Sequence, residues 1–561
     1  MMRINSSIRK LTTIFVVMFV AISGCLVYWQ VVKADQVTAT PHNPRICQPD
    51  NVPLRGNIYD RNGVLLAYSV PDPNACGGYT RHYTDPSLAG LIGYYVAGGL
   101  YPAIGLEAQY DAVLSGATGQ TAINNLVHKI LHTSQVGNNI YLTIDERIQK
   151  VVARDYADYT PDPTGTAFIN HTYPTYPTDR GAAVVTDPHT GEILAMVSSP
   201  GYDPNKMVDT LTHSQNPTSY YDQLVKDPEN PLLYRPTQGL YSPGSTFKTV
   251  TLMAGLDSGA TTLDQNWDMQ NAYKPWAIPQ TADSPGTTVV GDNLGYGKYV
   301  FHFPVNTEFG YANSDNIMFA HIGANVGQQK WLDYTKRMYF DQTIPADLPI
   351  AQSHVLQADG NLNFANFVND AYGQGVDFVT PMQMSLVDNT AANNGTLMRP
   401  MLISKITDKQ NNVVQNFDPQ QLSNVISPDA AYNTRVGMNA VATCGSAWHI
   451  TEDNRPPTTV IGKTGTGEVG GGKPPESWMI TQAPFDINNP QQVPALTIVA
   501  MRENGGEGAY SIGPAIWHMY SDIFNQNLVK TPLAPWNDPN VFCPEHNLWQ
   551  TRTGPQVHGN Q

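Results

Sequence analysis

A serine and a lysine three residues apart, Ser245 and Lys248, are the first residues in this sequence whose types and spacing suit catalysis. They lie within YSPGSTFKTVTLMAGLDSG (residues 241–259), where apolar residues recur with helical spacing. Side chains three residues apart on a helix share one face, with Cβ atoms roughly 5–6 Å apart. A serine hydroxyl is a weak nucleophile until a base removes its proton, and a buried lysine that loses its charge can be that base. The pair therefore indicates nucleophilic catalysis.

The same segment predicts how its helix begins and ends. Ser242 suits the N-cap, Pro243 the first helical position and Gly259 the C-terminal stop. Ser245 would then lie in the first turn, near the positive end of the helix dipole. We expect one face of the helix to present the serine and the lysine while the other face packs through Phe247, Val250, Met253 and Ala254.

Two further motifs follow in the chain. S-x-x-K alone is a common chance match in a sequence of this length. Here it is followed by Ser314-Asp315-Asn316 and then by Lys463-Thr464-Gly465-Thr466. S-x-x-K, S-D-N and K-T-G in this order are the signature of penicillin-recognising serine enzymes. We expect the backbone N–H groups of Ser245 and Thr466 to form the oxyanion hole.

Each motif residue has a part in this chemistry. Ser314 is expected to pass a proton between Lys248 and the leaving nitrogen, and Asn316 to hold a substrate peptide bond. Lys463 would direct positive charge toward a substrate carboxylate. The other motif residues are expected to bind substrate along a sheet edge: Asp315, Thr464, Gly465 and Thr466.

The elements that must position these residues come from both ends of one long segment. Residues 182–186 and 192–198 predict a hairpin with a Gly-containing turn. Three more short strands and a closing helix are predicted over residues 458–467, 478–481, 496–501 and 514–524. With a helix-rich stretch between, the pattern predicts one antiparallel sheet flanked by helices, an α+β fold.

A smaller unit precedes this segment. Asn62-Gly63 is a tight-turn dipeptide between apolar runs, which predicts a hairpin. Residues 111–132 have helical spacing, and residues 140–144 read as a strand. Asp145 then suits the N-cap of a helix that ends at residue 157. A Pro- and Thr-rich stretch near residue 160 marks the expected domain boundary.

The N-terminus predicts a membrane anchor. Residues 11–32 carry no charge and are long enough to cross a bilayer, and three basic residues, Arg3, Arg9 and Lys10, precede them. The bulk of the chain should therefore lie outside the cytoplasm. Alternatively, Ile22-Ser23-Gly24-Cys25 is a lipoprotein cleavage site, with Cys25 lipidated. We favour the uncleaved anchor, because the apolar run continues for seven residues beyond Cys25.

Charge and cysteine content exclude some functions. The net charge of −15 argues against a nucleic-acid partner, because phosphate contacts need a basic face. Cys47, Cys76, Cys444 and Cys543 allow three disulfide pairings, among which the sequence does not choose. The cysteines lack C-x-x-C spacing and His128 and His132 lack a third ligand, so we expect neither a metal site nor a cofactor.

The chain resembles the class B penicillin-binding proteins, the monofunctional peptidoglycan D,D-transpeptidases of bacteria. Besides the three catalytic motifs, the resemblance covers residues 55–67, 105–116, 142–149, 191–204, 372–381 and 389–395. Two positions depart from the family pattern. Gly467 stands where alanine is usual, and Asp315 is an uncommon middle residue of its motif.

The resemblance implies a β-lactamase/transpeptidase-like fold and four parts. These are a cytoplasmic tail and anchor, an N-terminal pedestal, a transpeptidase domain and a C-terminal tail, over residues 1–32, 33–160, 161–531 and 532–561. It implies a single-pass protein of the bacterial cell membrane, with an extracytoplasmic catalytic domain. Ser245 would form an acyl-enzyme with stem peptides ending in D-Ala-D-Ala, and β-lactam antibiotics would acylate it too. The implied partner is a glycan polymerase of the SEDS family.

Alternatives within the same superfamily are a β-lactamase, a D,D-carboxypeptidase and a β-lactam sensor. A β-lactamase needs no pedestal, the N-terminal motifs argue against a carboxypeptidase, and the intact motifs argue against a mere scaffold. The sequence leaves open whether the protein serves elongation, division or sporulation, and which amine accepts the acyl group.

Overall fold

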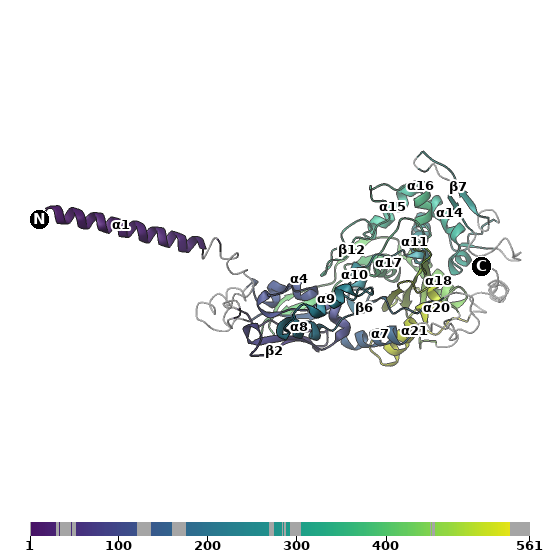
Figure 1. Cartoon of the computed structure of the whole chain (residues 1–561). Coiled ribbons are helices and arrows are strands. Elements are labelled where there is room, and N and C mark those ends of the chain that lie inside the picture. Colours follow the sequence, from purple (N-terminus) through teal and green to yellow (C-terminus); the bar gives the residue numbers. More distant parts are fainter. Residues whose placement is uncertain are drawn as a thin grey trace.

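The computed structural model describes residues 2–29, 33, 47, 52–119, 136–159, 175–268, 274–282, 284, 288–291, 305–448, 450 and 455–538. Helix α1 (Met2–Val27) projects away from two packed parts, a smaller N-terminal part and a larger C-terminal part (Figure 1). Within α1, Ile8–Val27 is long and apolar enough to cross a membrane, and none of it is buried.

The C-terminal part is built on a five-stranded antiparallel sheet of order β13-β14-β15-β5-β6. Its strands are β5 (Gly181–Thr186), β6 (Ile193–Ser199), β13 (Ile461–Gly467), β14 (Glu476–Ala483) and β15 (Leu496–Arg502). The predicted sheet from distant segments is therefore confirmed, with β13, the strand of the third motif, at an edge. The strand expected from residue 458 begins only at Ile461, because Thr458 and Thr459 bond to Ala534 instead.

Helices cover both faces of this sheet. On β14, Gln482 donates to Asp388 of α17 (Pro381–Ala392), while the adjacent Thr481 bonds to Tyr520 of α21 (Gly513–Asn525). Successive side chains of a strand point to opposite faces, so α17 and α21 lie on opposite sides. The predicted closing helix is thus confirmed as one of the two covering layers.

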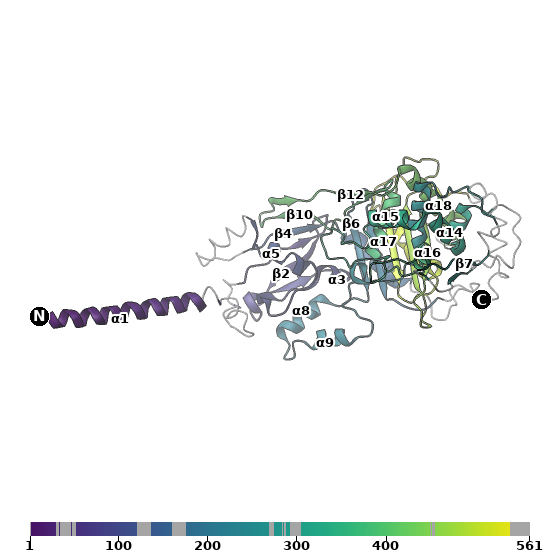
Figure 2. The same ribbon diagram turned by 90° about the horizontal axis from the view of Figure 1, so that it is seen from above.

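Further helices surround this core (Figure 2). They are α10 (Arg235–Gln238), α11 (Lys248–Ser258), α13 (Thr307–Ala312), α14 (Asn316–Val326), α15 (Gln328–Arg337), α16 (Phe364–Asp370), α18 (Pro428–Thr443) and α20 (Gly508–Ser511). Helices α8 (Pro204–His213) and α9 (Ser219–Lys226) lie instead beside the N-terminal part, and their buried apolar residues belong to its core cluster. Two small two-stranded sheets pair β7 (Trp276–Ile278) with β8 (Thr288–Val290) and β9 (Thr396–Met398) with β12 (Gln421–Asn424).

The N-terminal part is built on a six-stranded sheet of order β11-β10-β4-β1-β2-β3. Its strands are β1 (Ile58–Tyr59), β2 (Leu65–Pro71), β3 (Tyr79–Tyr83), β4 (Asn139–Leu142), β10 (Ile403–Thr407) and β11 (Val413–Asn416). The hairpin predicted at Asn62-Gly63 is confirmed as β1–β2. Strands β10 and β11 reach this sheet from late in the chain, so the six-stranded sheet is not formed by the N-terminal segment alone.

Short helices complete the N-terminal part: α3 (Ala89–Ile92), α4 (Gly105–Gln109) and α5 (Asp111–Leu114). The longer helix α7 (Glu146–Asp158) packs instead against α21 and β6 of the C-terminal part (Figure 1). Asp145 caps α7 by accepting from the N–H of Arg147, as predicted. The helix expected over residues 111–132 begins at Asp111 as predicted but ends at Leu114, because the chain turns at Gly116 with φ of 72°. Its second half, with His128 and His132, lies outside the described residues.

A shared apolar core joins the two parts. Ile58 and Ile140 of the six-stranded sheet belong to one buried cluster with Val184, Ile193 and Met196 of the five-stranded sheet. Burying such side chains is worth about 1.5–3 kcal/mol each, so the two parts stabilise one another.

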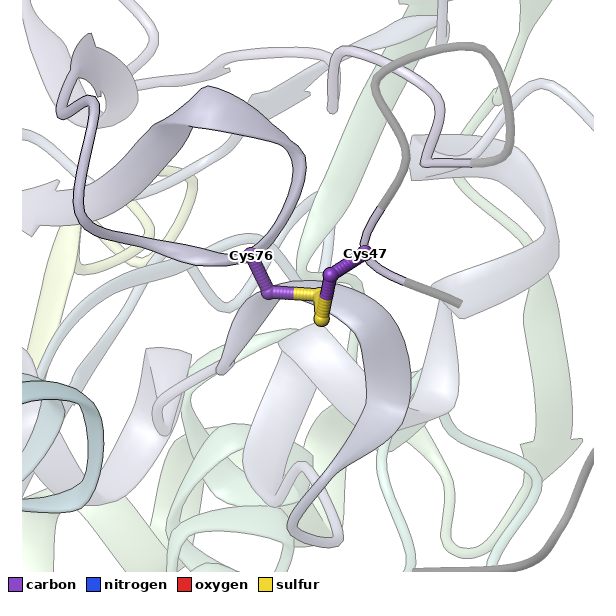
Figure 3. The surroundings of a disulfide bond; sticks show 2 residues. All are labelled: Cys47 and Cys76. Atoms are coloured by element: carbon purple, nitrogen blue, oxygen red, sulfur yellow. A yellow bond between two sulfur atoms is a disulfide. The ribbon is translucent and has the colours of Figure 1, made fainter. Parts of the chain in front are cut away.

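The structure contains one disulfide bond between described cysteines. Cys47 bonds to Cys76, with 4.4 Å between their Cα atoms (Figure 3). Cys444 is also disulfide-bonded, to a partner outside the described residues, while Cys25 is free and exposed. The two bonded cysteines, Cys47 and Cys76, are 29 positions apart in the sequence. The bond links the chain that follows the anchor to the N-terminal part.

Candidate active site

The first motif lies on a 3₁₀ turn, η7 (Gly244–Phe247), that leads directly into α11. The predicted N-cap at Ser242 is wrong, because no side chain caps this turn and the Ser242 carbonyl accepts the indole N–H of Trp478 at 2.9 Å. Ser245 therefore precedes the α-helix rather than lying in its first turn. The predicted stop at Gly259 is confirmed, with φ of 74°.

Helix α11 is buried on all sides, not on one face as the apolar spacing predicted. Every residue from Lys248 to Gly255 is buried, because α14, α15, α17 and α18 surround the helix. Ser245 is the exception in this stretch, since it is only partly buried while its neighbours Gly244 and Thr246 are covered. The hydroxyl is thus accessible, and the lysine below it is not.

Three polar side chains surround the amine of Lys248. Its Nζ lies 2.6 Å from Oγ of Ser245, 2.7 Å from Oδ1 of Asn316 and 3.3 Å from Oγ of Ser314. Burial lowers the pKa of Lys248 well below that of an ordinary lysine, and the cation of Lys463 lowers it further, whereas Asp315 opposes the shift. The amine therefore gives up its proton more readily than an ordinary lysine does, which suits it to act as a base.

The second motif lies where α13 gives way to α14. Ser314 has a left-handed backbone, with φ of 66°, which turns its side chain toward Lys248. Asp315 is buried and caps α14 by accepting from the N–H of Met318 at 3.0 Å. Its uncommon carboxylate thus fixes the start of the helix that carries Asn316.

The third motif lies on the edge strand β13. Nζ of Lys463 donates to Oγ of Ser314 at 3.0 Å, so Ser314 lies between the two lysines. Burial lowers the pKa of Lys463 to about 7, an effect that the carboxyl of Glu507 opposes. The hydroxyl of Thr464 is buried and bonds to Ser446, whereas Thr466 is partly exposed.

Glycines let β13 approach the serine turn. A Cβ on Gly465 would lie 2.8 Å from Cγ2 of Thr246, and one on Gly467 would lie 2.2 Å from the carbonyl oxygen of Ser242. Gly244, with φ of 53°, would clash in turn with the carbonyl oxygen of Thr466. Gly467, the departure from the family pattern, thus belongs to this close contact.

The structure brings all the predicted catalytic residues together: Ser245, Lys248, Ser314, Asn316 and Lys463. It adds two rings that the sequence analysis missed. Nζ of Lys463 lies 5.6 Å from the ring of Tyr311, and Nζ of Lys248 lies 5.9 Å from the ring of Tyr372. Tyr311 precedes the second motif by three residues, and Tyr372 begins the recognised YGQG stretch, but neither pattern indicates a lysine neighbour.

Chemically, the site holds the Ser245 hydroxyl against a buried amine of lowered pKa, and a second hydroxyl, that of Ser314, leads to a second lysine. This is the arrangement that nucleophilic acyl transfer requires. The partly exposed members, Ser245, Ser314, Asn316 and Thr466, are those that a substrate can contact.

Comparison with protein families agrees with this geometry. The family model described as "Penicillin binding protein transpeptidase domain" matches residues 181–516, and that described as "Penicillin binding protein A dimerisation domain" matches residues 55–140. The chain belongs to the penicillin-binding protein transpeptidase family. It is a serine-type transpeptidase, and the resemblance to class B members is confirmed.

Individual relatives extend over most of the chain. It is 29% identical over 519 residues to "Peptidoglycan D,D-transpeptidase PbpA" of Mycolicibacterium smegmatis, covering 91% of this chain and 96% of that protein. It is 27% identical to "Peptidoglycan D,D-transpeptidase MrdA" of Escherichia coli, covering 84% and 71%. The imipenem acyl-enzyme of penicillin-binding protein A from M. tuberculosis superposes with a TM-score of 0.69, at 27% identity, covering 83% and 97%.

Replacing Lys248 tests the base. Lys248→Ala should lower the acylation rate by about 10⁴–10⁶-fold, the loss seen when one member of a comparable nucleophile–base pair is removed. The rate is measured with a fluorescent penicillin on the full-length protein in detergent. Lys473→Ala, which removes an exposed lysine beyond β13, is the matched control and should acylate normally. Near-normal acylation of Lys248→Ala would contradict the assignment.

Proposed function

We propose that this protein crosslinks peptidoglycan through an acyl-enzyme on Ser245. Lys248 removes the Ser245 proton as Oγ attacks the carbonyl between the two terminal D-Ala residues of a stem peptide. The proton passes through Ser314 to the leaving nitrogen, so the peptide bond breaks as the ester forms. An amine from a neighbouring stem then attacks the ester, forms the new amide and returns the proton to Ser245.

The observation that carries this proposal is the 2.6 Å separation between Nζ of Lys248 and Oγ of Ser245. We assign substrate binding to the partly exposed Asn316 and Thr466, with the N–H groups of Ser245 and Thr466 as the oxyanion hole. In its charged form, Lys463 would attract the substrate carboxylate. Thr464, Gly465 and Asp315 would support the site from behind. The Thr464 hydroxyl bonds to that of Ser446, and Gly465 lies against Thr246. Asp315 accepts a hydrogen bond from the N–H of Met318.

Labelling and turnover together test this function. The full-length protein should release D-Ala from a labelled stem-peptide donor and join the donor to an acceptor amine, and a β-lactam should abolish both. Digestion after reaction with a labelled penicillin should recover the label on Ser245, and Ser245→Ala should take up none. Label on another residue would refute the nucleophile, and release of D-Ala to water alone would point to a carboxypeptidase.

We propose that α1 anchors the protein as a single-pass segment of the bacterial cell membrane, with the catalytic part extracytoplasmic. The exposed apolar surface of Ile8–Val27 and the basic residues that precede it support this topology. In intact spheroplasts, an added protease should degrade the C-terminal part while leaving cytoplasmic proteins intact. Protection of the C-terminal part would contradict the topology, and loss of the first 24 residues from the mature chain would support the lipoprotein alternative.

We propose that the N-terminal part, which combines the pedestal assigned to residues 33–160 with strands β10 and β11, serves to dock a SEDS-family glycan polymerase. The edge strand β11, which completes its sheet, exposes Val413 and Val414. An exposed strand edge with apolar side chains is a recurrent protein-docking feature.

Substitution on this edge tests the docking proposal. Val414→Lys should reduce co-purification with the polymerase at least tenfold and leave penicillin labelling unchanged. Val289→Lys, at an equally exposed valine on β8 of the catalytic part, should leave both unchanged. Normal polymerase binding by Val414→Lys would exclude β11 from the interface.

A further inference from the structure

Two buried carboxyl groups lie behind the active site without a cation between them. Asp370 ends α16, and Asp377 follows it within the loop of residues 370–379, the linking loop. Their side chains are within hydrogen-bonding reach of each other, and both are fully buried. Among the described residues, neither forms a salt bridge, and Oδ2 of each has no other hydrogen-bond partner.

The two carboxyls fold the linking loop onto itself. Oδ1 of Asp370 accepts from the N–H groups of Val376 at 2.6 Å and Asp377 at 3.2 Å. Oδ1 of Asp377 accepts from the N–H of Gly375 at 3.1 Å. A Cβ at Gly375 would lie 1.9 Å from Oδ1 of Asp370, so the backbone is wrapped closely around that carboxyl.

The folded loop contacts both the serine turn and β13. A Cβ at Gly373 would lie 1.8 Å from the carbonyl oxygen of Gly244, the residue before the nucleophile. Val379 exchanges two backbone hydrogen bonds with Tyr241, and Nε2 of Gln374 donates to the carbonyl oxygen of Thr466 at 2.9 Å. The linking loop thus sets the separation between the serine turn and the strand that carries the proposed oxyanion N–H.

Like charges this close and this deeply buried repel each other strongly. We propose that Asp370 and Asp377 share one proton, as an O–H···O bond between their Oδ2 atoms, and that this proton keeps the linking loop closed and the serine turn positioned against β13. They act as positioning residues, since neither touches the substrate. This inference rests on the proposed acylation of Ser245, and it adds a requirement that the catalytic motifs do not contain.

The pKa directions agree with this geometry. Burial raises the pKa of Asp370 well above that of an ordinary carboxyl, with a further rise from Asp377, and burial raises the pKa of Asp377 to about 7. Raised pKa values in the folded protein mean that the closed loop is most stable at low pH. The closed loop loses this stability once the pH rises above neutrality far enough for the pair to give up its last proton.

Other titratable groups surround the linking loop. The pKa of Tyr372 is raised to about 12 by burial and then by the carboxyls of Glu468, Asp377 and Asp370. Lys248 faces the Tyr372 ring from α11, and Lys463 lies on β13. His354 pairs through its backbone with Phe378. These groups are unchanged when one of the two carboxyls is replaced by an amide. The ratio of the variant's acylation rate to the wild-type rate therefore cancels the direct effect of their titration on the rate.

Asp377→Asn separates the shared proton from simple packing. Its amide N–H can donate permanently to Asp370, and its oxygen can still accept from Gly375. The test is the acylation rate of the full-length protein with a fluorescent penicillin between pH 6 and pH 10, with thermal melting as the check on folding. We expect the variant to match the wild type near pH 6. Above the pH where the pair loses its last proton, the wild type should fall behind the variant by about tenfold per pH unit.

Asp155→Asn is the control. It removes another buried carboxyl with a raised pKa, of about 6, from α7, and it should keep the wild-type profile throughout. A constant ratio between Asp377→Asn and wild type up to pH 10 would overturn the proposal, as would a folded but inactive variant at pH 6. Asp370→Asn repeats the test if the first variant does not fold, and misfolding of both would also overturn the proposal. Absence of Ser245 acylation in the wild type at every pH would instead refute the proposed function itself.

Discussion

The structure depends on keeping one lysine amine out of water. Lys248 is fully buried, and within the described chain it has polar oxygens around it but no salt bridge. A full charge is costly in such a place, so burial lowers the pKa of the amine well below that of an ordinary lysine. Lysines usually lie on the protein surface as cations, whereas this environment suits Lys248 to act as a base for the adjacent Ser245.

This burial needs segments that are far apart in the chain. Helix α11 is enclosed by α14, α15, α17 and α18, and β13 closes over the serine turn from the sheet edge. Gly244, Gly465 and Gly467 lie at backbone contacts that leave no room for a Cβ. The second lysine, Lys463, then contributes both positive charge and a hydrogen bond to Ser314. The catalytic chemistry therefore depends on the packing, because loosening these contacts would admit water and bring the pKa of Lys248 back toward that of an ordinary lysine.

Much of this arrangement could be predicted from the sequence because its signals are local. The apolar runs gave the strands of the main sheet, Asn62-Gly63 gave the first hairpin and Asp145 gave a helix cap. The three motifs named the residues that the structure brings together around Lys248, since residue type and order are what their chemistry constrains.

Other features could not be predicted, because they arise from contacts between distant segments. Serine is a common N-cap residue, but the carbonyl of Ser242 accepts a hydrogen bond from the indole N–H of Trp478, and the turn that follows is 3₁₀. Nothing near residue 403 indicates that β10 joins a sheet begun at residue 58. Tyr311 and Tyr372 become neighbours of the two lysines only after folding. The first seven residues of the expected C-terminal tail are described, and Ala534 among them packs against Thr458 and Thr459.

The most direct test of this account is the pH at which Lys248 becomes a competent base in the full-length wild type. A buried amine of strongly lowered pKa predicts that the rate of Ser245 acylation reaches its maximum well below pH 10.5 and falls on the acid side of that maximum. A rate that still rises tenfold per pH unit toward pH 10.5, the ordinary lysine pKa, would show that Lys248 is charged at neutral pH and would contradict the account.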